Sequence, residues 1–335
     1  MVSNILCNIS GVSATSNVIT VPDDYPTIQS AIDSAQSGDT VFVRSGTYFE
    51  NIIVNKSISL IGNNRETTII EGVEGSYLIN GVVEVLANNV VIKGLTITSS
   101  VVGTRGIYLN SVSGGLLEDL IVENIKLGPG IRLFKSRSNE VKNCNAISCY
   151  EGVVIGIAST PTASEHNKIC NNKIIGCNTG IKLHYSRDNS VSNNELDDGG
   201  SGVRLFVSHD NVITDNLIQN NSAAFTIDEY SSGNKIYNNT CLNNSESVYM
   251  LMESEINTWD NGSIGNYWSD YTGQDGNGDN IGDTPCIFDG NNTDRFPLMS
   301  PYFIPEFPSW TLLLLFFVVV PFMIIFKKNR LPHNN

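Results

Sequence analysis

The stretch His209–Asn221, HDNVITDNLIQNN, decides the fold, because it places polar amides directly beside residues that belong in a core. Four of its thirteen residues are asparagine and two are aspartate. Similar stretches lie on both sides, and the first asparagine of each serves as an anchor: Asn139, Asn167, Asn189, Asn211, Asn234 and Asn257. The anchors are 28, 22, 22, 23 and 23 residues apart, and the 28 is a 22 enlarged by an insertion at 158–163. Spacing this regular predicts a repeat protein.

The positions that follow each anchor predict short strands. Two residues after the anchors lie Val141, Ile169, Val191, Ile213, Ile236 and Trp259. After each of the first five anchors, the thirteenth residue is small and the fourteenth and sixteenth residues are apolar. A spacing of two between apolar residues is the period of a strand. One such unit cannot bury its apolar face alone, so the units are expected to stack.

Stacking predicts an all-β fold, a parallel β-helix built as a single-stranded solenoid of about 22-residue coils. It is expected to be right-handed, the usual hand of parallel crossovers. Parallel strands about 4.8 Å apart bring equivalent asparagines together, so their amides can hydrogen-bond along a ladder. The asparagines themselves are expected to take the left-handed backbone of turns. We expect eight or nine coils between Asn51 and Trp259.

Composition limits the partners. The net charge is −14, which disfavours general nucleic-acid binding, because phosphates attract cationic surfaces. Nine acidic residues and no lysine or arginine lie between Glu253 and Asp294, which suggests cations as partners.

The C-terminal region predicts a membrane anchor. Residues 310–326 carry no charge, and Lys327, Lys328 and Arg330 follow at once. We therefore expect a single transmembrane helix with its tail inside the cell and the solenoid outside. A buried core helix is the alternative. Residues 1–18 are either a weak or truncated signal segment or part of the mature chain.

Two long stretches resemble known proteins. Residues 19–62, ITVPDDYPTIQSAIDSAQSGDTVFVRSGTYFENIIVNKSISLIG, resemble the opening of pectin-lyase-like β-helix proteins, most of all the NosD-like carbohydrate-binding and sugar-hydrolase group. Its apolar stripe, Ile28, Ala31, Ile32 and Ala35, predicts a helix that caps the solenoid. Residues 257–302 resemble the closing segment of archaeal NosD-like surface proteins.

The segment PEFPSW at 305–310, followed by the span and basic tail, resembles the PEF-CTERM sorting signal of archaeal surface proteins. That resemblance implies processing by a sorting enzyme, an archaeosortase; a plain membrane anchor is the alternative. The predicted organisation is then a possible signal segment at 1–18, a cap with the first strands at 19–50, β-helix repeats at 51–256, an acidic closing segment at 257–302, a proline linker at 303–309, the span at 310–326 and a basic tail at 327–335.

Catalysis on sugar chains has only weak candidates. Inverting hydrolysis needs two carboxylates roughly 6.5–9.5 Å apart. Asp197, Asp198 and Asp210 are the candidates, and adjacent acids in a turn are usually only solvated.

A glycan-binding face is the second hypothesis. Fifteen residues after the anchors, Lys182 and Arg204 point outward, with Arg132 expected in the same column one coil earlier. Seventeen residues on lie His184 and Phe206, with Phe134 matching. Basic groups beside rings suit an acidic glycan, whereas a plain solvated sheet face is the alternative.

Metal binding is the third hypothesis. The NosD resemblance implies a link to copper, which prefers His, Cys and Met ligands. Copper is not expected here, because His184 and His209 do not share an offset. Calcium fits better, since oxygen-bearing side chains alternate in one glycine-containing loop: Asp275, Asn277, Asp279 and Asp283. An Asx-rich turn is the alternative.

Seven cysteines occur, and two of them share an offset. Cys149 and Cys177 lie ten residues after their anchors, so they should stack within disulfide range. Two buried thiols are the alternative.

These patterns favour a surface protein that is structural or adhesive, that contacts a glycan or cell-surface polymer, and that does not catalyse. The alternatives are a hydrolase or lyase of uronate-rich polysaccharides and a copper-related accessory protein.

Overall fold

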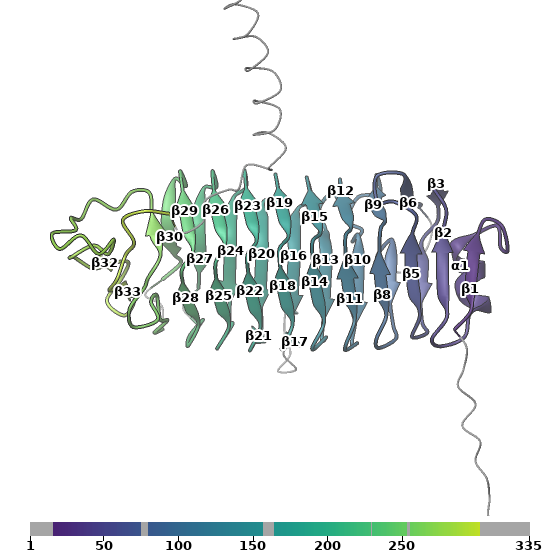
Figure 1. The fold of residues 1–335 in the computed structure, drawn as a ribbon, viewed down its shortest axis with the longest axis horizontal. Helices are drawn as coiled ribbons and strands as arrows, with labels where there is room; N and C mark the ends of the chain where they lie inside the picture. Colours follow the sequence, from purple (N-terminus) through teal and green to yellow (C-terminus); the bar gives the residue numbers. More distant parts are fainter. Residues whose placement is uncertain (1–15, 75–79, 157–163, 229, 253–254, 302–335) are drawn as a thin grey trace, which may run out of the picture. The chain divides into compact units, whose positions relative to one another are not determined.

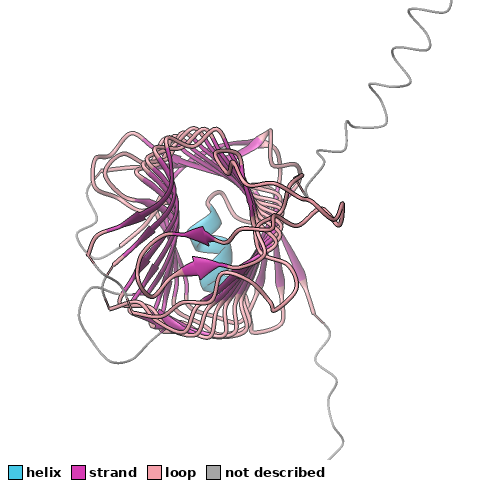
Figure 2. Ribbon diagram, turned by 90° about the vertical axis from the view of Figure 1, so that its left-hand side faces the viewer, coloured by secondary structure: helices cyan, strands magenta, loops and turns pink. Residues whose placement is uncertain are grey.

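A computed structural model describes residues 16–74, 80–156, 164–228, 230–252 and 255–301. They form a parallel β-helix of the right-handed type, in which each coil contributes one strand to each of three long sheets (Figure 1). The predicted all-β parallel β-helix is confirmed. Figure 2 looks along the axis of the solenoid and shows the sheets enclosing its interior.

The strands fall into sheets A, B and C, each parallel throughout. Sheet A contains β1 (Val18–Val21), β2 (Thr40–Val43), β5 (Ser59–Gly62), β8 (Val91–Lys93), β11 (Leu116–Glu118), β14 (Glu140–Lys142), β18 (Lys168–Cys170), β22 (Ser190–Ser192), β25 (Val212–Thr214) and β28 (Lys235–Tyr237). Sheet B contains β3 (Gly46–Phe49), β6 (Thr68–Gly72), β9 (Thr96–Ser99), β12 (Ile121–Glu123), β15 (Asn145–Ile147), β19 (Lys173–Ile175), β23 (Glu195–Asp197), β26 (Leu217–Gln219), β29 (Thr240–Leu242) and β31 (Tyr267–Trp268). Sheet C contains β4 (Ile52–Val54), β7 (Val83–Val85), β10 (Ile107–Asn110), β13 (Pro129–Phe134), β16 (Glu151–Gly156), β20 (Thr179–His184), β24 (Ser201–Phe206), β27 (Ala223–Ile227) and β30 (Glu246–Met250).

The nine strands of sheet C lie between Asn51 and Trp259 and agree with the expected coil number. Sheets A and B have ten strands, because β1 extends sheet A at its N-terminal end and β31 extends sheet B at its C-terminal end. The predicted helix is present as α1 (Ile28–Ser34), with Thr27 as its N-cap. It buries Ile28, Ala31 and Ile32 and contacts β1, β2 and β4. Figure 2 shows it within the outline of the sheets.

The register confirms the predicted columns. Val153, Ile181 and Val203 pair in succession on sheet C, and all three are buried. The apolar column two residues after the anchors, from Val141 to Trp259, is fully buried. The small column is small for a physical reason: a Cβ at Gly180 would lie 2.6 Å from the carbonyl oxygen of Gly202 in the next coil.

The anchor asparagines form the predicted ladder. In each step the side-chain amide of one anchor donates to Oδ1 of the next, as from Asn167 to Asn189 at 3.0 Å and from Asn211 to Asn234 at 2.9 Å. A second ladder runs through Asn172, Asn194, Asn216, Asn239 and Asn266. The asparagines therefore satisfy one another inside the coil, where they are almost inaccessible to solvent.

The expectation that these asparagines take the left-handed conformation is wrong. The residue before the ladder asparagine takes it instead in all coils except those of Asn257 and Asn266, as at Asp188 (φ 54°) in the first ladder and Asn193 (φ 56°) in the second. The turn at that preceding residue leaves the ladder asparagine with its side chain buried, in line with its neighbours in the coils before and after.

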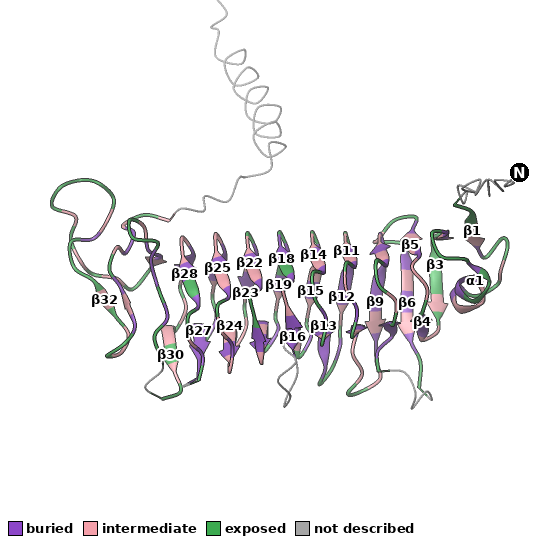
Figure 3. Cartoon of the chain, turned by 90° about the horizontal axis from the view of Figure 1, so that it is seen from below, coloured by how far each residue is buried: buried purple, intermediate pink, exposed green. Residues whose placement is uncertain are grey.

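Two small sheets complete the described structure. β17 (Ser164–Glu165) pairs in parallel with β21 (Ser186–Arg187), and β32 (Cys286–Ile287) pairs antiparallel with β33 (Thr293–Asp294). In the view coloured by burial, the segment around β32 is largely exposed, whereas the coil strands are largely buried or intermediate (Figure 3).

The predicted signal segment falls almost wholly on residues that the structure does not describe. The proline linker, the span at 310–326 and the basic tail also lie outside the described residues. Within the described ranges, no helix combines the length and the apolar character needed to cross a membrane.

Candidate functional site

The outer side of sheet C carries the predicted basic column. Pairing runs from Arg132 to Val154, then to Lys182 and on to Arg204. The expectation that Arg132 lies one coil before Lys182 is therefore wrong, because the coil that contains the 158–163 insertion supplies Val154 in between. Arg132 and Arg204 are three coils apart, about 14 Å at the spacing of parallel strands. We call the surface formed by Arg132, Phe134, Lys182, His184, Arg204 and Phe206 the sheet C face.

Rings accompany the cations on this face. His184 pairs with Phe206 in the register, and their rings meet edge to face with centroids 4.9 Å apart. The guanidinium of Arg132 lies 5.7 Å from the ring centroid of Phe134. Tyr108, which pairs with Arg132, lies 5.6 Å from the ring of Phe134. Tyr108 was not predicted from the sequence, although residues 106–110 (GIYLN) match residues 130–134 (GIRLF) and place it in the column of Arg132.

The cationic side chains of the sheet C face differ in whether they have a polar partner. Lys182 forms an ion pair with Glu151 at 2.7 Å. By contrast, the Nε atoms of Arg132 and Arg204 are buried and have no hydrogen-bond partner in the described part of the chain. Burial and the neighbouring Arg105 lower the pKa of Arg132. An anion placed here would therefore stabilise cations that are poorly compensated.

His184 is neutral at physiological pH. Burial, followed by the charges of Lys182 and Arg132, lowers the pKa of His184 to about 4. Its imidazole therefore acts as a ring and a hydrogen-bonding group, not as a further cation.

The candidate catalytic carboxylates do not converge. Asp197 ends β23 of sheet B, and its two oxygens accept hydrogen bonds from Gln219 and Asn220. Asp198 follows in the turn that leads to β24, whereas Asp210 lies beyond the other end of β24. A six-residue strand separates these turns by about 20 Å, which is too far for a carboxylate pair.

The predicted calcium loop contains an Asx-rich turn. Oδ1 of Asp275 accepts the backbone N–H of Gly278 at 2.7 Å, and its Oδ2 accepts that of Asn280 at 2.8 Å. Asn277 and Asp279 are linked by a side-chain hydrogen bond of 3.0 Å, and Asp283 accepts the backbone N–H of Gly276. Calcium would have to displace or share these bonds, and its binding here stays a prediction.

Cys149 and Cys177 lie against one another, as their shared offset predicted. Both are free, buried thiols in the structure. A hydrogen bond to the Cys177 thiol and burial raise the pKa of Cys149 well above its ordinary value. The disulfide between them stays a prediction.

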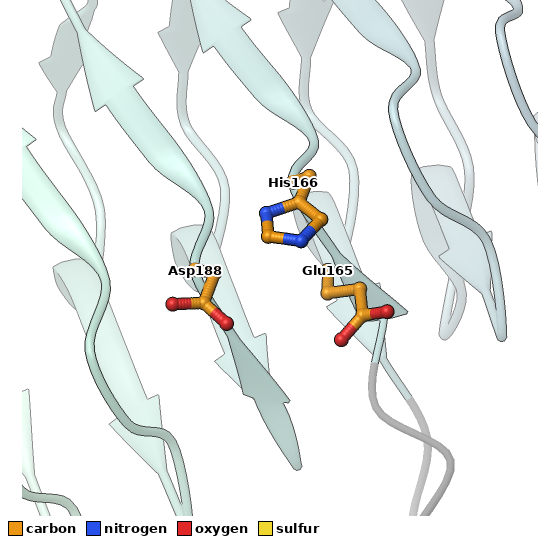
Figure 4. Close-up of side chains that lie close together, drawn as sticks. All are labelled: Glu165, His166 and Asp188. Atoms are coloured by element: carbon orange, nitrogen blue, oxygen red, sulfur yellow. The ribbon is translucent and has the colours of Figure 1, made fainter.

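A cluster that the sequence reasoning missed lies at the turn between sheets C and A. One donor atom each from Glu165, His166 and Asp188 lie within 4.8 Å of one another (Figure 4). His166 and Asp188 precede successive anchors, and both have left-handed backbones, with φ of 57° and 54°. Glu165 comes from β17 and pairs with Arg187 of β21. The shared offset of His166 and Asp188 is the signal that could have revealed the cluster.

Comparison with protein-family models shows to which family this chain belongs. The model described as "Periplasmic copper-binding protein (NosD)" matches residues 32–273, well over half of the chain. The chain belongs to the NosD family. This confirms the resemblance seen in the opening and closing segments of the sequence.

Other similarities of this NosD-family chain are more limited. It is 32% identical over 130 residues to a cell surface glycoprotein of Methanothermus fervidus, a match that covers 36% of the chain and 20% of the relative. The catalytic domain of a GH87 alpha-1,3-glucanase shares the fold in two structures: with tetrasaccharides at a TM-score of 0.55 and with nigerose at 0.52. Each is 15% identical; they cover 68% and 67% of this chain and 45% of the glucanase chain.

The family description raises the question of copper, so the available ligands matter. Cys144 and Cys241 are poor candidates, since burial raises the pKa of Cys144 to about 12 and that of Cys241 well above its ordinary value. Among the described residues, Glu165, His166 and Asp188 form the one group of three close donors. An imidazole with two carboxylates fits copper(II) or zinc, whereas copper(I) prefers softer sulfur ligands.

Proposed function

We propose that this chain is an extracellular β-helix protein, anchored in the membrane by residues 310–326, that binds an acidic glycan of the cell surface through the sheet C face. The role is structural or adhesive and requires no catalysis. The observation that carries the proposal is the pair of buried guanidinium Nε atoms of Arg132 and Arg204, which lack partners within the described residues; the guanidinium of Arg132 also lies beside the ring of Phe134.

The chemistry of the face supports an anionic ligand. Arginine binds carboxylate or sulfate oxygens in bidentate fashion, and the neighbouring rings offer apolar planes to sugar rings. The neutral ring of His184 beside Phe206 extends that apolar surface. The cell surface glycoprotein from Methanothermus fervidus supports the location, and the carbohydrate complexes of the glucanase support glycans as ligands of this fold.

The test is direct binding of the full chain in detergent to polygalacturonate and to alginate, with neutral dextran as the comparison. A charged hydrogen bond contributes about 1.5–3 kcal/mol, so Arg132→Gln and Arg204→Gln are each expected to weaken binding roughly tenfold to hundredfold. Arg137→Gln removes an exposed arginine at the turn outside this face and should change nothing. Equal weakening by all three variants would reduce the effect to net charge and reject the face.

Cleavage is the alternative function, and the shared fold with a glycoside hydrolase catalytic domain favours testing it. The same incubations are examined for new reducing or unsaturated chain ends. Retention without new ends supports adhesion, whereas new ends make the chain a polysaccharide hydrolase or lyase.

A further inference from the structure

We infer that Glu165, His166 and Asp188 form a binding site for a divalent first-row transition ion, with copper(II) bound most tightly. The inference is independent of the glycan proposal, since the cluster lies at the turn between sheets C and A, outside the sheet C face.

The donor set selects the class of ion. Imidazole suits zinc, copper and nickel, and carboxylates complete such sites without demanding a thiolate. Magnesium and calcium prefer oxygen ligands alone, so a nitrogen in the set disfavours them. Among divalent ions of the first row, affinity for a given site rises to copper(II).

The geometry requires little rearrangement. Ligand atoms bound to one ion at about 2.0–2.2 Å lie at most about 4.4 Å apart. The three donors already lie within 4.8 Å of one another, and His166 and Asp188 are exposed. Within the described residues, the imidazole of His166 has no hydrogen-bond partner that an ion would have to displace.

The fold fixes the two coils that supply the ligands. His166 and Asp188 occupy the same turn position in successive coils, and the anchors that follow them, Asn167 and Asn189, are joined by the ladder at 3.0 Å. The ligand backbone is therefore held on both coils by buried hydrogen bonds. Glu165 adds the third donor from the strand that immediately precedes His166.

Arg187 occupies the place where a cation is expected. Its Nη2 and Nε lie 3.1 and 3.2 Å from Oε2 of Glu165, and its Nε lies 3.8 Å from Oδ2 of Asp188. A metal ion would compete with this guanidinium for both carboxylates. Because Arg187 is exposed, it can swing away, and its removal should strengthen metal binding.

The experiment titrates the metal-free full chain with copper(II), and separately with zinc, by calorimetry in the presence of glycine as a competing ligand. Electron paramagnetic resonance of the copper complex reports the number of bound nitrogens. His166→Asn and Asp188→Asn keep a residue that tolerates the left-handed backbone, so the turn is preserved. Each is expected to weaken copper(II) binding at least roughly tenfold, since even the loss of a residue that only orients a ligand costs that much.

Arg187→Gln is expected to tighten binding roughly fivefold, the effect of one unit charge at 4 Å in water. Asp198→Asn is the matched control, because Asp198 is an exposed aspartate with φ of 56° at the turn between sheets B and C. It should leave the affinity unchanged. Absence of copper binding, an unaltered affinity in His166→Asn, or a spectrum without a bound imidazole in the wild type would each overturn the inference.

Discussion

Truncation of one ladder asparagine tests how the coil is stabilised. The side-chain amide of Asn216 donates to Oδ1 of Asn239 at 2.9 Å and to the backbone carbonyls of Val191 and Thr214 at 3.0 and 2.9 Å. Its own Oδ1 accepts both the backbone N–H and the side-chain amide of Asn194, at 3.0 and 2.9 Å. Asn216→Ala removes all five bonds at a position with no solvent access.

The expected cost is large, because water cannot replace the lost partners. The backbone N–H of Asn194 loses its acceptor, and a buried group left unsatisfied costs about 1–3 kcal/mol. The lost carbonyl contacts and the small cavity raise the total to about 4 kcal/mol. The control is Asn193→Gly at an exposed left-handed position, which should stay within about 0.5 kcal/mol of the wild type.

Urea unfolding of the full chain, followed by tryptophan fluorescence, measures both variants. Trp259 and Trp268 are buried in the final coils and report on their packing. A cost below about 1 kcal/mol for Asn216→Ala, or one equal to that of Asn193→Gly, would refute the view that the ladder is a major source of stability.

Three further predictions concern the core and the coil end. Burial raises the pKa of Asp294 from 3.8 to about 6, so the protonated form is favoured in the folded state. The unfolding free energy should therefore fall by about 3 kcal/mol as the pH rises from about 3 to above 6, and Asp294→Asn should remove that fall in urea titrations made at each pH. Oxidation should join Cys149 to Cys177, detected as a loss of two titratable thiols and a linked peptide pair in mass spectrometry; thiols that persist in the unfolded, oxidant-treated chain would contradict this. Gly180→Ala should cost about 2 kcal/mol in thermal or urea unfolding, because its Cβ would press on the backbone of Gly202, and a variant as stable as the wild type would contradict such close packing.

The repeat made most of the fold predictable. Because equivalent offsets stack, the anchors alone fixed the buried column from Val141 to Trp259, the sheet C register and the Asn ladder. The conformation of the turns was less predictable. Asparagine is common both as a left-handed residue and as a buried ladder residue, and only the structure shows that Asn193 is the first and Asn194 the second.

The candidate sites were predicted less completely, for two physical reasons. The insertion at 158–163 lengthens the spacing between two anchors. The sequence pattern therefore did not reveal that the coil with Val154 lies between Arg132 and Lys182. A comparison of histidine offsets alone does not predict the metal ligands, because His166 stacks on an aspartate of the next coil. Side-chain pairing across coils depends on which residue types share an offset, and unlike residues at one offset are easy to miss.

The direction of the ladders has an electrical consequence. Along each ladder, one side-chain N–H donates to the next asparagine toward the C-terminal end, while Oδ1 accepts from the preceding one, so the amide dipoles add along each column as peptide dipoles do along a helix. Both columns finish on a carboxylate at the positive end. In the first, the backbone N–H of Asn257 donates to Oδ1 of Asn292 at 3.1 Å, and the amide of Asn292 donates to Asp289 at 2.9 Å. In the second, the backbone N–H of Asn266 donates to Asp294 at 2.8 Å. A coil inserted anywhere along the solenoid would lengthen the columns and leave this terminal charge compensation in place.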